Sequence, residues 1–143
     1  MIRCHASSVA IEGRGVLLRG PSGAGKSDLA LRLIDGGGQL ISDDYTEIHV
    51  RDGAAFLSAP AGIAGRLEVR GLGLMPLAAV QDIPLALVFD LRPYETIERM
   101  PDADVETFEG IEVPRRVLDP FMASAAAIVR LALRQDPLLT GYE

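Results

Sequence analysis

GPSGAGKS, residues 20–27, has the spacing of a phosphate-binding loop of the Walker A type: a glycine, four further residues, then glycine, lysine and serine. Glycines let the backbone turn so that successive N–H groups point at phosphate oxygens. Lys26 is the only lysine of a chain that also carries thirteen arginines, and a compact ammonium can follow a transferring phosphate. The expected phosphate-binding residues are Gly20, Pro21, Ser22, Gly23, Ala24, Gly25, Lys26 and Ser27.

The residues on both sides of this loop agree with that interpretation. The apolar run 16–18 is typical of a short buried strand. Apolar residues then recur at helical spacing over 29–34, and three glycines at 36–38 end the expected helix. A loop between a strand and a helix presents the helix N-terminus, with its free N–H groups, to an anion.

Composition narrows the class of protein. A chain of 143 residues is long enough for one domain with a real core, so we expect a single catalytic domain over 1–143. The formal charge of −6 argues against nucleic-acid binding, which needs a clustered basic face. One cysteine, the lack of a continuous apolar signal region at the start and the lack of a long apolar stretch predict a cytoplasmic protein without a membrane partner.

The rest of the chain predicts many short strands and few helices. The expected strands cover 9–12, 15–19, 39–42, 46–50, 54–59, 66–70 and 85–90. A second helix is expected with Asp119 as its N-cap and Pro120 at its first position, ending at Asp136-Pro137, and a third, short helix over 93–99. This pattern predicts a strand-rich α/β fold rather than the regular alternation of a doubly wound kinase.

Phosphoryl transfer also needs a metal-binding carboxylate and a group that orients or deprotonates the acceptor. Asp43 and Asp44 follow the apolar strand 39–42, and adjacent side chains on an extended segment point in opposite directions. One acid would then approach a metal while the other faces the acceptor. Asp90 also follows an apolar run, 85–89, and periodicity does not choose between it and the pair.

Two further features are weaker signals by themselves. LEVRGLG, residues 67–73, puts Glu68 and Arg70 beside two glycines, which suits a magnesium ligand and a loop near phosphate but equally an edge strand and a turn. His5 is a single histidine, a residue type more often structural than catalytic when it stands alone.

Four elements together resemble, in order and approximate spacing, the catalytic domain of HPr kinase/phosphorylase. They are His5, GPSGAGKS, LISDD at 40–44 and LEVRGLG. The resemblance runs from His5 to the region of Arg134. It implies a strand-rich P-loop kinase core like that of phosphoenolpyruvate carboxykinase. It also implies ATP- and magnesium-dependent phosphorylation of a serine on HPr, the phosphocarrier protein of the phosphotransferase system, and reversal by inorganic phosphate.

The resemblance assigns roles to residues of this chain. Lys26 and the loop amides would bind the nucleotide phosphates, and Ser27 with Glu68 would bind magnesium, supported by Asp43. Asp44 would accept the serine proton in the forward reaction and return it in the reverse one, and His5 would help to position Asp44 or phosphate. The match of IERMP, residues 97–101, to a tyrosine-acid-arginine context nominates Arg99 as the essential arginine.

Departures from the family pattern shape the remaining expectations. Only four residues precede His5, so we expect no separate N-terminal domain, and no PGR element follows VPRRVLDPF, which predicts weak phosphorolysis supplied by Arg99 with Arg115 or Arg116. A homo-oligomer is expected, and whether it is a hexamer as in the family stays open. Two alternatives stay open: a P-loop kinase for a small molecule, and a nucleotide-binding switch that does not transfer phosphate.

Overall fold

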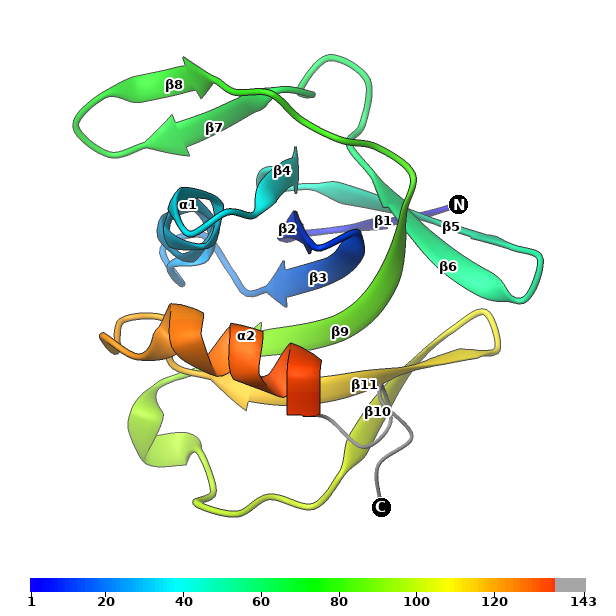
Figure 1. Cartoon of the computed structure of the whole chain (residues 1–143), viewed down its shortest axis with the longest axis vertical. Coiled ribbons are helices and arrows are strands. Elements are labelled where there is room, and N and C mark those ends of the chain that lie inside the picture. The colour runs from blue at the N-terminus through cyan, green and yellow to red at the C-terminus, as the bar shows by residue number, and fades with distance from the viewer. Residues whose placement is uncertain (136–143) are drawn as a thin grey trace.

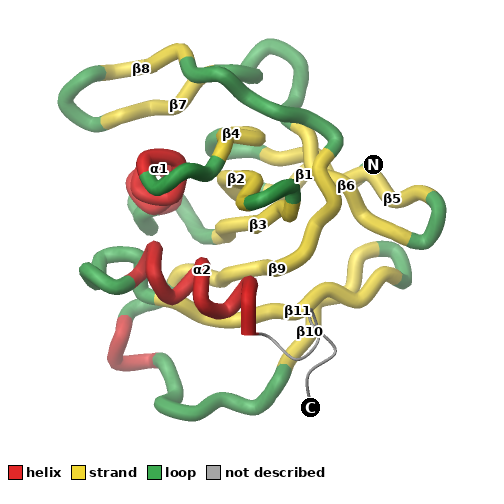
Figure 2. Tube along the Cα trace, viewed as in Figure 1, coloured by secondary structure: helices red, strands yellow, loops and turns green. Residues whose placement is uncertain are grey.

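The computed structural model describes residues 1–135 of the chain. In chain order the elements are β1 (Ile2–Cys4), β2 (Ala6–Ile11), β3 (Arg14–Arg19), α1 (Lys26–Asp35), β4 (Gln39–Ser42), β5 (Thr46–Arg51), β6 (Ala54–Ser58), β7 (Arg66–Val69), β8 (Gly73–Pro76), β9 (Ile83–Leu91), a 3₁₀ turn (Tyr94–Thr96), β10 (Asp104–Phe108), β11 (Ile111–Leu118) and α2 (Ala125–Gln135) (Figure 1). Figure 2 shows how strands dominate this part of the chain.

One large sheet is organised around β9, the long curved strand in the middle of Figure 1. The order along the sheet is β1-β5-β6-β9-β3-β2-β4, with β11 pairing with β9 and β10 pairing with β11. The start of β9 pairs antiparallel with β6, and its later part pairs in parallel with β3 and with β11. The two parallel neighbours of β9 therefore end at the same edge of the sheet, where the loop 20–25 begins.

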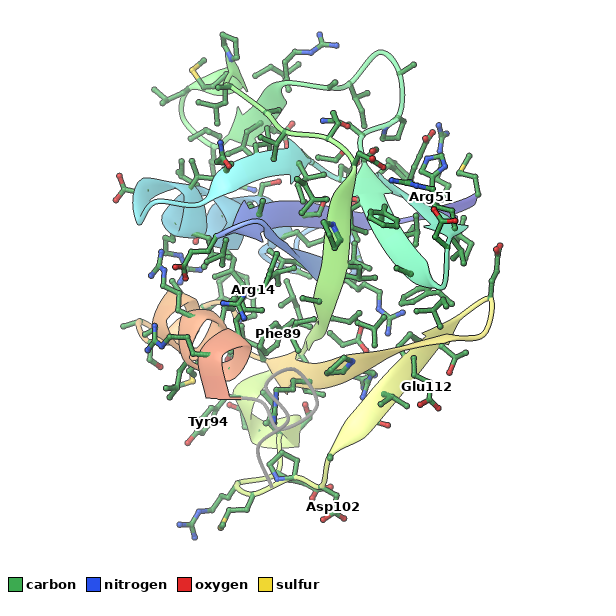
Figure 3. The ribbon with its side chains drawn as sticks, turned by 45° about the vertical axis from the view of Figure 1, so that its right-hand side comes forward. Arg14, Arg51, Phe89, Tyr94, Asp102 and Glu112 are labelled. Carbon is green, nitrogen blue, oxygen red and sulfur yellow. The ribbon has the colours of Figure 1, made fainter. Side chains whose placement is uncertain are left out.

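Alternating side chains on β3 and β9 divide the core into two clusters. Leu18 and Phe89 lie in the cluster that the sheet shares with α1 and α2, whereas Leu17 and Val88 lie in the cluster on the opposite face. All four side chains are fully buried, as the two-residue period of a strand covered on both faces requires. Figure 3 shows Phe89 inside the molecule, close to α2.

A separate two-stranded sheet, the β7–β8 hairpin, lies on the side of α1 that faces away from α2 (Figure 1). Leu67 of β7 is fully buried in the cluster that contains the α1 side chains, which fixes the hairpin to the helix. The turn of the hairpin and β8 are more open, with Leu72 and Leu74 largely exposed. The hairpin thus has a fixed base and an exposed apolar edge.

The expected strands are all present, with ends that shift by up to three residues. Four further strands, β1, β8, β10 and β11, are not among those expected. The hairpin of β10 and β11 is the most informative of these, because it contains a proline. Pro114 argues against a strand because it cannot donate to a ladder. In β11, however, residue 114 pairs only with β10, since pairing with β9 starts at Arg115, so one side of Pro114 needs no ladder partner among the described strands.

The expected start of the second helix is wrong. α2 begins at Ala125, because residues 119–122 form a turn in which the Asp119 carboxylate accepts from the N–H of Phe121 at 2.9 Å and from the N–H of Tyr94 at 3.1 Å. Asp119 therefore ties two loops together instead of capping a helix. The expected stop at Asp136-Pro137 lies outside the described residues, and the short helix expected over 93–99 is the 3₁₀ turn. Neither α-helix within 1–135 is long and apolar enough to cross a membrane.

Candidate active site

The loop 20–25 joins the end of β3 to the start of α1, as the motif predicts. Gly23 and Gly25 have φ angles of 85° and 96°, in the left-handed region that favours glycine. A Cβ at Gly25 would also lie 2.9 Å from the Pro120 side chain and 3.2 Å from that of Phe121. No described side chain caps α1, so its first N–H groups are available to an anion.

Lys26 is held inside this loop. Its side chain is only 5% exposed, and its Nζ donates to the carbonyls of Gly20 at 2.6 Å and Pro21 at 3.1 Å. Burial lowers the pKa of Lys26, while the charges of Asp44 and Asp43 oppose that shift. An ammonium has three donors, so a third N–H remains for a phosphate oxygen.

Asp43 is buried and joins three parts of the site. Its Oδ1 accepts from the hydroxyls of Ser27 at 2.7 Å and Ser7 at 2.9 Å, and its Oδ2 accepts from the backbone N–H of Glu68 at 3.1 Å. One carboxylate therefore connects the start of α1, the strand β2 and the β7–β8 hairpin. Charged hydrogen bonds of this kind fix its orientation towards Ser27.

Asp44 turns the other way and is open to solvent. Its φ of 69° lies in the left-handed region, which aspartate tolerates better than most residues and which is enriched at functional sites. The Oδ1 of Asp44 lies 2.8 Å from His5 Nε2 and 4.0 Å from Lys26 Nζ, and its side chain is 54% exposed. The ring of His5 stacks on Tyr45 with centroids 4.8 Å apart, which restrains the histidine beside the carboxylate.

A cavity of about 910 Å³, the P-loop cavity, connects these groups. It is bounded by the loop and the start of α1, by Asp43, Asp44 and Tyr45, by the hairpin residues Arg66, Glu68, Arg70 and Leu74, and by Phe121. Seven residues are expected to act in catalysis or metal binding. Five of them line this cavity: Lys26, Ser27, Asp43, Asp44 and Glu68. His5 joins the group through its contact with Asp44, and Arg99 does not line this cavity.

The oxygen donors beside Lys26 suit magnesium. Mg²⁺ is usually held by one or two carboxylates, a hydroxyl, substrate phosphates and water rather than by a closed protein cage. Ser27 and Asp43 lie side by side, and Glu68 lines the same cavity. Within residues 1–135 no group of three His, Cys, Asp or Glu side chains could hold a metal by itself.

Asp90 lies outside the P-loop cavity and is part of an ion-pair network. Its carboxylate accepts from Arg19 at 2.7 Å and from Arg115 at 2.5 Å, and those arginines also contact Glu106 and Asp104. Burial acts to raise the pKa of Asp90, but the hydrogen bonds and charges of Arg19 and Arg115 outweigh it and hold that pKa below its ordinary value. Asp90 thus joins β3, β9 and β11.

The three candidate arginines are not brought to the phosphate loop. Arg99, Arg115 and Arg116 line a second cavity of about 770 Å³, together with Tyr94 and Asp102, which Figure 3 shows at the lower edge of the molecule. Arg115 is engaged by Asp90 and Asp104. Of the described arginines, Arg66 and Arg70 line the P-loop cavity.

Several residues of the site had no sequence signal. Ser7 donates to Asp43 and accepts from the N–H of Asp44 at 3.0 Å, so it orients both acids. Tyr45 and Phe121 carry the exposed rings beside the cavity. A serine in a strand and isolated aromatic residues match no motif, and only their position in the fold distinguishes them.

Known proteins with a similar sequence and a similar structure support this description of the fold. The family described as HPr Serine kinase C-terminal domain matches residues 1–83. A solved structure, the HPr(Ser) kinase/phosphatase of Coxiella burnetii, has a TM-score of 0.85 at 26% identity and covers 96% of this chain and 97% of that one. The expectation of a strand-rich P-loop kinase core is confirmed.

Curated relatives include HPr kinase/phosphorylases from several bacteria. That of Clostridium botulinum (strain Eklund 17B / Type B) is 40% identical over 85 residues, which are 59% of this chain and 28% of the relative. That of Limosilactobacillus reuteri (strain DSM 20016) is 33% identical over 123 residues, covering 78% of this chain and 38% of the relative. The chain therefore spans well under half the length of these relatives.

Proposed function

Because this chain belongs to the HPr serine kinase C-terminal domain family, we propose that it is an ATP- and magnesium-dependent protein kinase that phosphorylates a serine of an HPr-type phosphocarrier protein. The observation that carries the proposal is the divergence of two adjacent acids. Asp43 points at Ser27 on the phosphate side, whereas Asp44 points at His5 on an open side. A nucleotide-binding switch needs the first contact but has no use for the second.

On the acceptor side, Asp44 would take the serine proton. As the serine oxygen forms its bond to the γ-phosphorus, the bond between that phosphorus and the β–γ bridging oxygen breaks, and its electrons leave with ADP. The 54% exposure of Asp44 lets a protein hydroxyl reach the carboxylate. His5 would hold Oδ1 of Asp44 in place, with Tyr45 restraining the histidine ring.

On the phosphate side, Lys26 and the N–H groups at the start of α1 would stabilise the charge that develops on the phosphate oxygens. Ser27, Asp43 and Glu68 would hold Mg²⁺. When bound, the metal supplies positive charge to the phosphates. Burial of Lys26 strengthens its interaction with a phosphate, because little water screens the ammonium.

In the reverse direction an oxygen of inorganic phosphate would attack the phosphorus of phosphoserine and form pyrophosphate. The bond between that phosphorus and the serine oxygen would break, and the protonated Asp44 would return its proton to the serine oxygen. A second anion beside a negative site needs a basic group. Arg70 and Arg66 border the cavity, and the family-based expectation names Arg99 with Arg115 or Arg116. We propose that this activity is the weaker of the two.

The function is tested by incubating the purified chain with radiolabelled ATP, Mg²⁺ and either HPr or a panel of small hydroxylated metabolites. We expect label on HPr serine alone, and loss of labelling when EDTA removes the metal. Label on a metabolite would favour a small-molecule kinase instead. Nucleotide binding without transfer to any acceptor would identify a switch and overturn the proposal.

Two arginines compete for the role of stabilising the transferring phosphate, and paired variants separate them. Arg70 lines the P-loop cavity, so we expect Arg70→Ala to lower the transfer rate at least about tenfold. Arg99→Ala should have the smaller effect, because Arg99 lines the second cavity. Initial rates at saturating ATP measure both. A larger loss in the Arg99 variant would indicate that the segment 97–103, from this or a second copy, reaches the phosphates.

A further inference from the structure

Phe121 is an exposed aromatic residue at the edge of the P-loop cavity. Phe121 is 71% exposed and lines the cavity, whereas the nearby apolar residues Leu118 and Ala125 are buried. A phenylalanine that is mostly exposed to water gains little burial energy in the free protein. None of the residue roles proposed for phosphate transfer involves Phe121, so they do not explain why an exposed ring lies at this edge.

The backbone that carries Phe121 is firmly held. Arg32 of α1 donates to the carbonyls of Pro120 and Met122, the latter at 3.4 Å, and itself pairs with Asp28 at 2.9 Å. The N–H of Phe121 donates to the Asp119 carboxylate at 2.9 Å. The ring therefore projects from a segment anchored to the helix that starts at the phosphate loop, and binding to it costs little ordering of the backbone.

The ring lies directly beside the phosphate loop. A Cβ at Gly25 would be 3.2 Å from Cζ of Phe121, so the ring tip contacts the turn that leads into α1. Leu31, one turn further along α1 than Asp28, lines the same cavity and adds apolar surface. An apolar wall thus continues from the phosphate cradle towards solvent.

This wall is on the side where a nucleoside would leave the loop. In phosphoryl transfer the attacking and leaving oxygens lie roughly in line, so the acceptor and the nucleoside approach the γ-phosphate from opposite sides. Asp44 and His5 mark the acceptor side, at the end of β4. In Figure 1, β4 and the segment before α2, which carries Phe121, lie on opposite sides of α1.

We propose that Phe121 is the platform on which the base of the bound nucleotide stacks. The inference rests on the proposed function, since it extends the phosphate site to the nucleoside. Base stacking on an aromatic ring tolerates different bases, because every base has a π-face. The platform would therefore select for a nucleoside over bare phosphate rather than for one base.

Calorimetry on the full chain with ATP and with inorganic tripolyphosphate, both with Mg²⁺, tests the platform. Tripolyphosphate carries the phosphates without the base. We expect Phe121→Ala to weaken ATP binding about tenfold and to leave tripolyphosphate binding unchanged. Phe121→Tyr keeps the ring and should bind ATP like the unmodified chain.

Leu74→Ala is the matched control, because Leu74 is also exposed and apolar and lines the same cavity from the hairpin. It should leave both ligands unaffected. Equal weakening of both ligands by Phe121→Ala, no weakening of either, or a selective loss of ATP in the Leu74 variant would overturn the platform. So would unchanged ATP binding with a raised KM for HPr, which would identify Phe121 as a contact for the protein substrate. If the unmodified chain binds neither ligand, the proposed function itself fails.

Discussion

Replacing Lys26 by alanine is expected to lower the rate of phosphoryl transfer about 100- to 1,000-fold, because the buried ammonium that faces the phosphates is lost. ATP affinity should fall as well. The free energy of unfolding should change by only about 1 kcal/mol, since burial already disfavours the charged form of Lys26. Transfer rates, calorimetric ATP binding and thermal unfolding measure the three effects.

Lys26→Arg keeps the charge and is the informative control. The Lys26 side chain is 5% exposed and its Nζ bonds the two carbonyls at the start of its own loop, a space that fits a compact group. A guanidinium is larger and planar, and it directs its donors differently. We expect this variant to fail nearly as badly as the alanine variant. A normal transfer rate would contradict the point-charge role of the only lysine.

Asp44→Asn is expected to lower transfer to HPr about 100- to 10,000-fold while ATP binding is largely kept. The amide has nearly the shape of the carboxylate and can still contact His5, but it cannot accept the serine proton. Asp43, which contacts Ser27 on the phosphate side, stays intact. Transfer rates measured beside calorimetric ATP binding separate a loss of chemistry from a loss of binding.

Asp90→Asn provides the comparison, because Asp90 is the other acid that follows an apolar strand. It should cost about 1–3 kcal/mol in the free energy of unfolding, since Arg19 and Arg115 lose a charged partner, and should change the transfer rate of the folded protein much less. An inactive Asp90 variant together with an active Asp44 variant would reverse the assignment.

The pair Asp43-Asp44 illustrates how far local reasoning reaches. Two acids after an apolar strand predict side chains that point apart, and Asp43 contacts Ser27 whereas Asp44 contacts His5. That one acid serves a metal and the other the acceptor stays a prediction. The left-handed backbone at Asp44 and the contribution of Ser7 were not predictable, because both depend on pairing between β2 and β4 across more than thirty residues.

The sequence by itself determined the phosphate loop, its flanking strand and helix, and the strand-rich character of the fold, because these follow from glycine placement, lysine chemistry and side-chain periodicity within short windows. Tertiary structure decided the rest. Pairing within the sheet placed Asp90 between two arginines, and the loop before β10 placed Arg99 at the second cavity. Arg32 and Asp119 hold residues 121 and 122 in a turn, so α2 begins only at Ala125 and Phe121 lies beside Gly25. Such outcomes depend on which distant groups meet, and no local pattern encodes the charge or hydrogen-bond partner that a folded neighbour supplies.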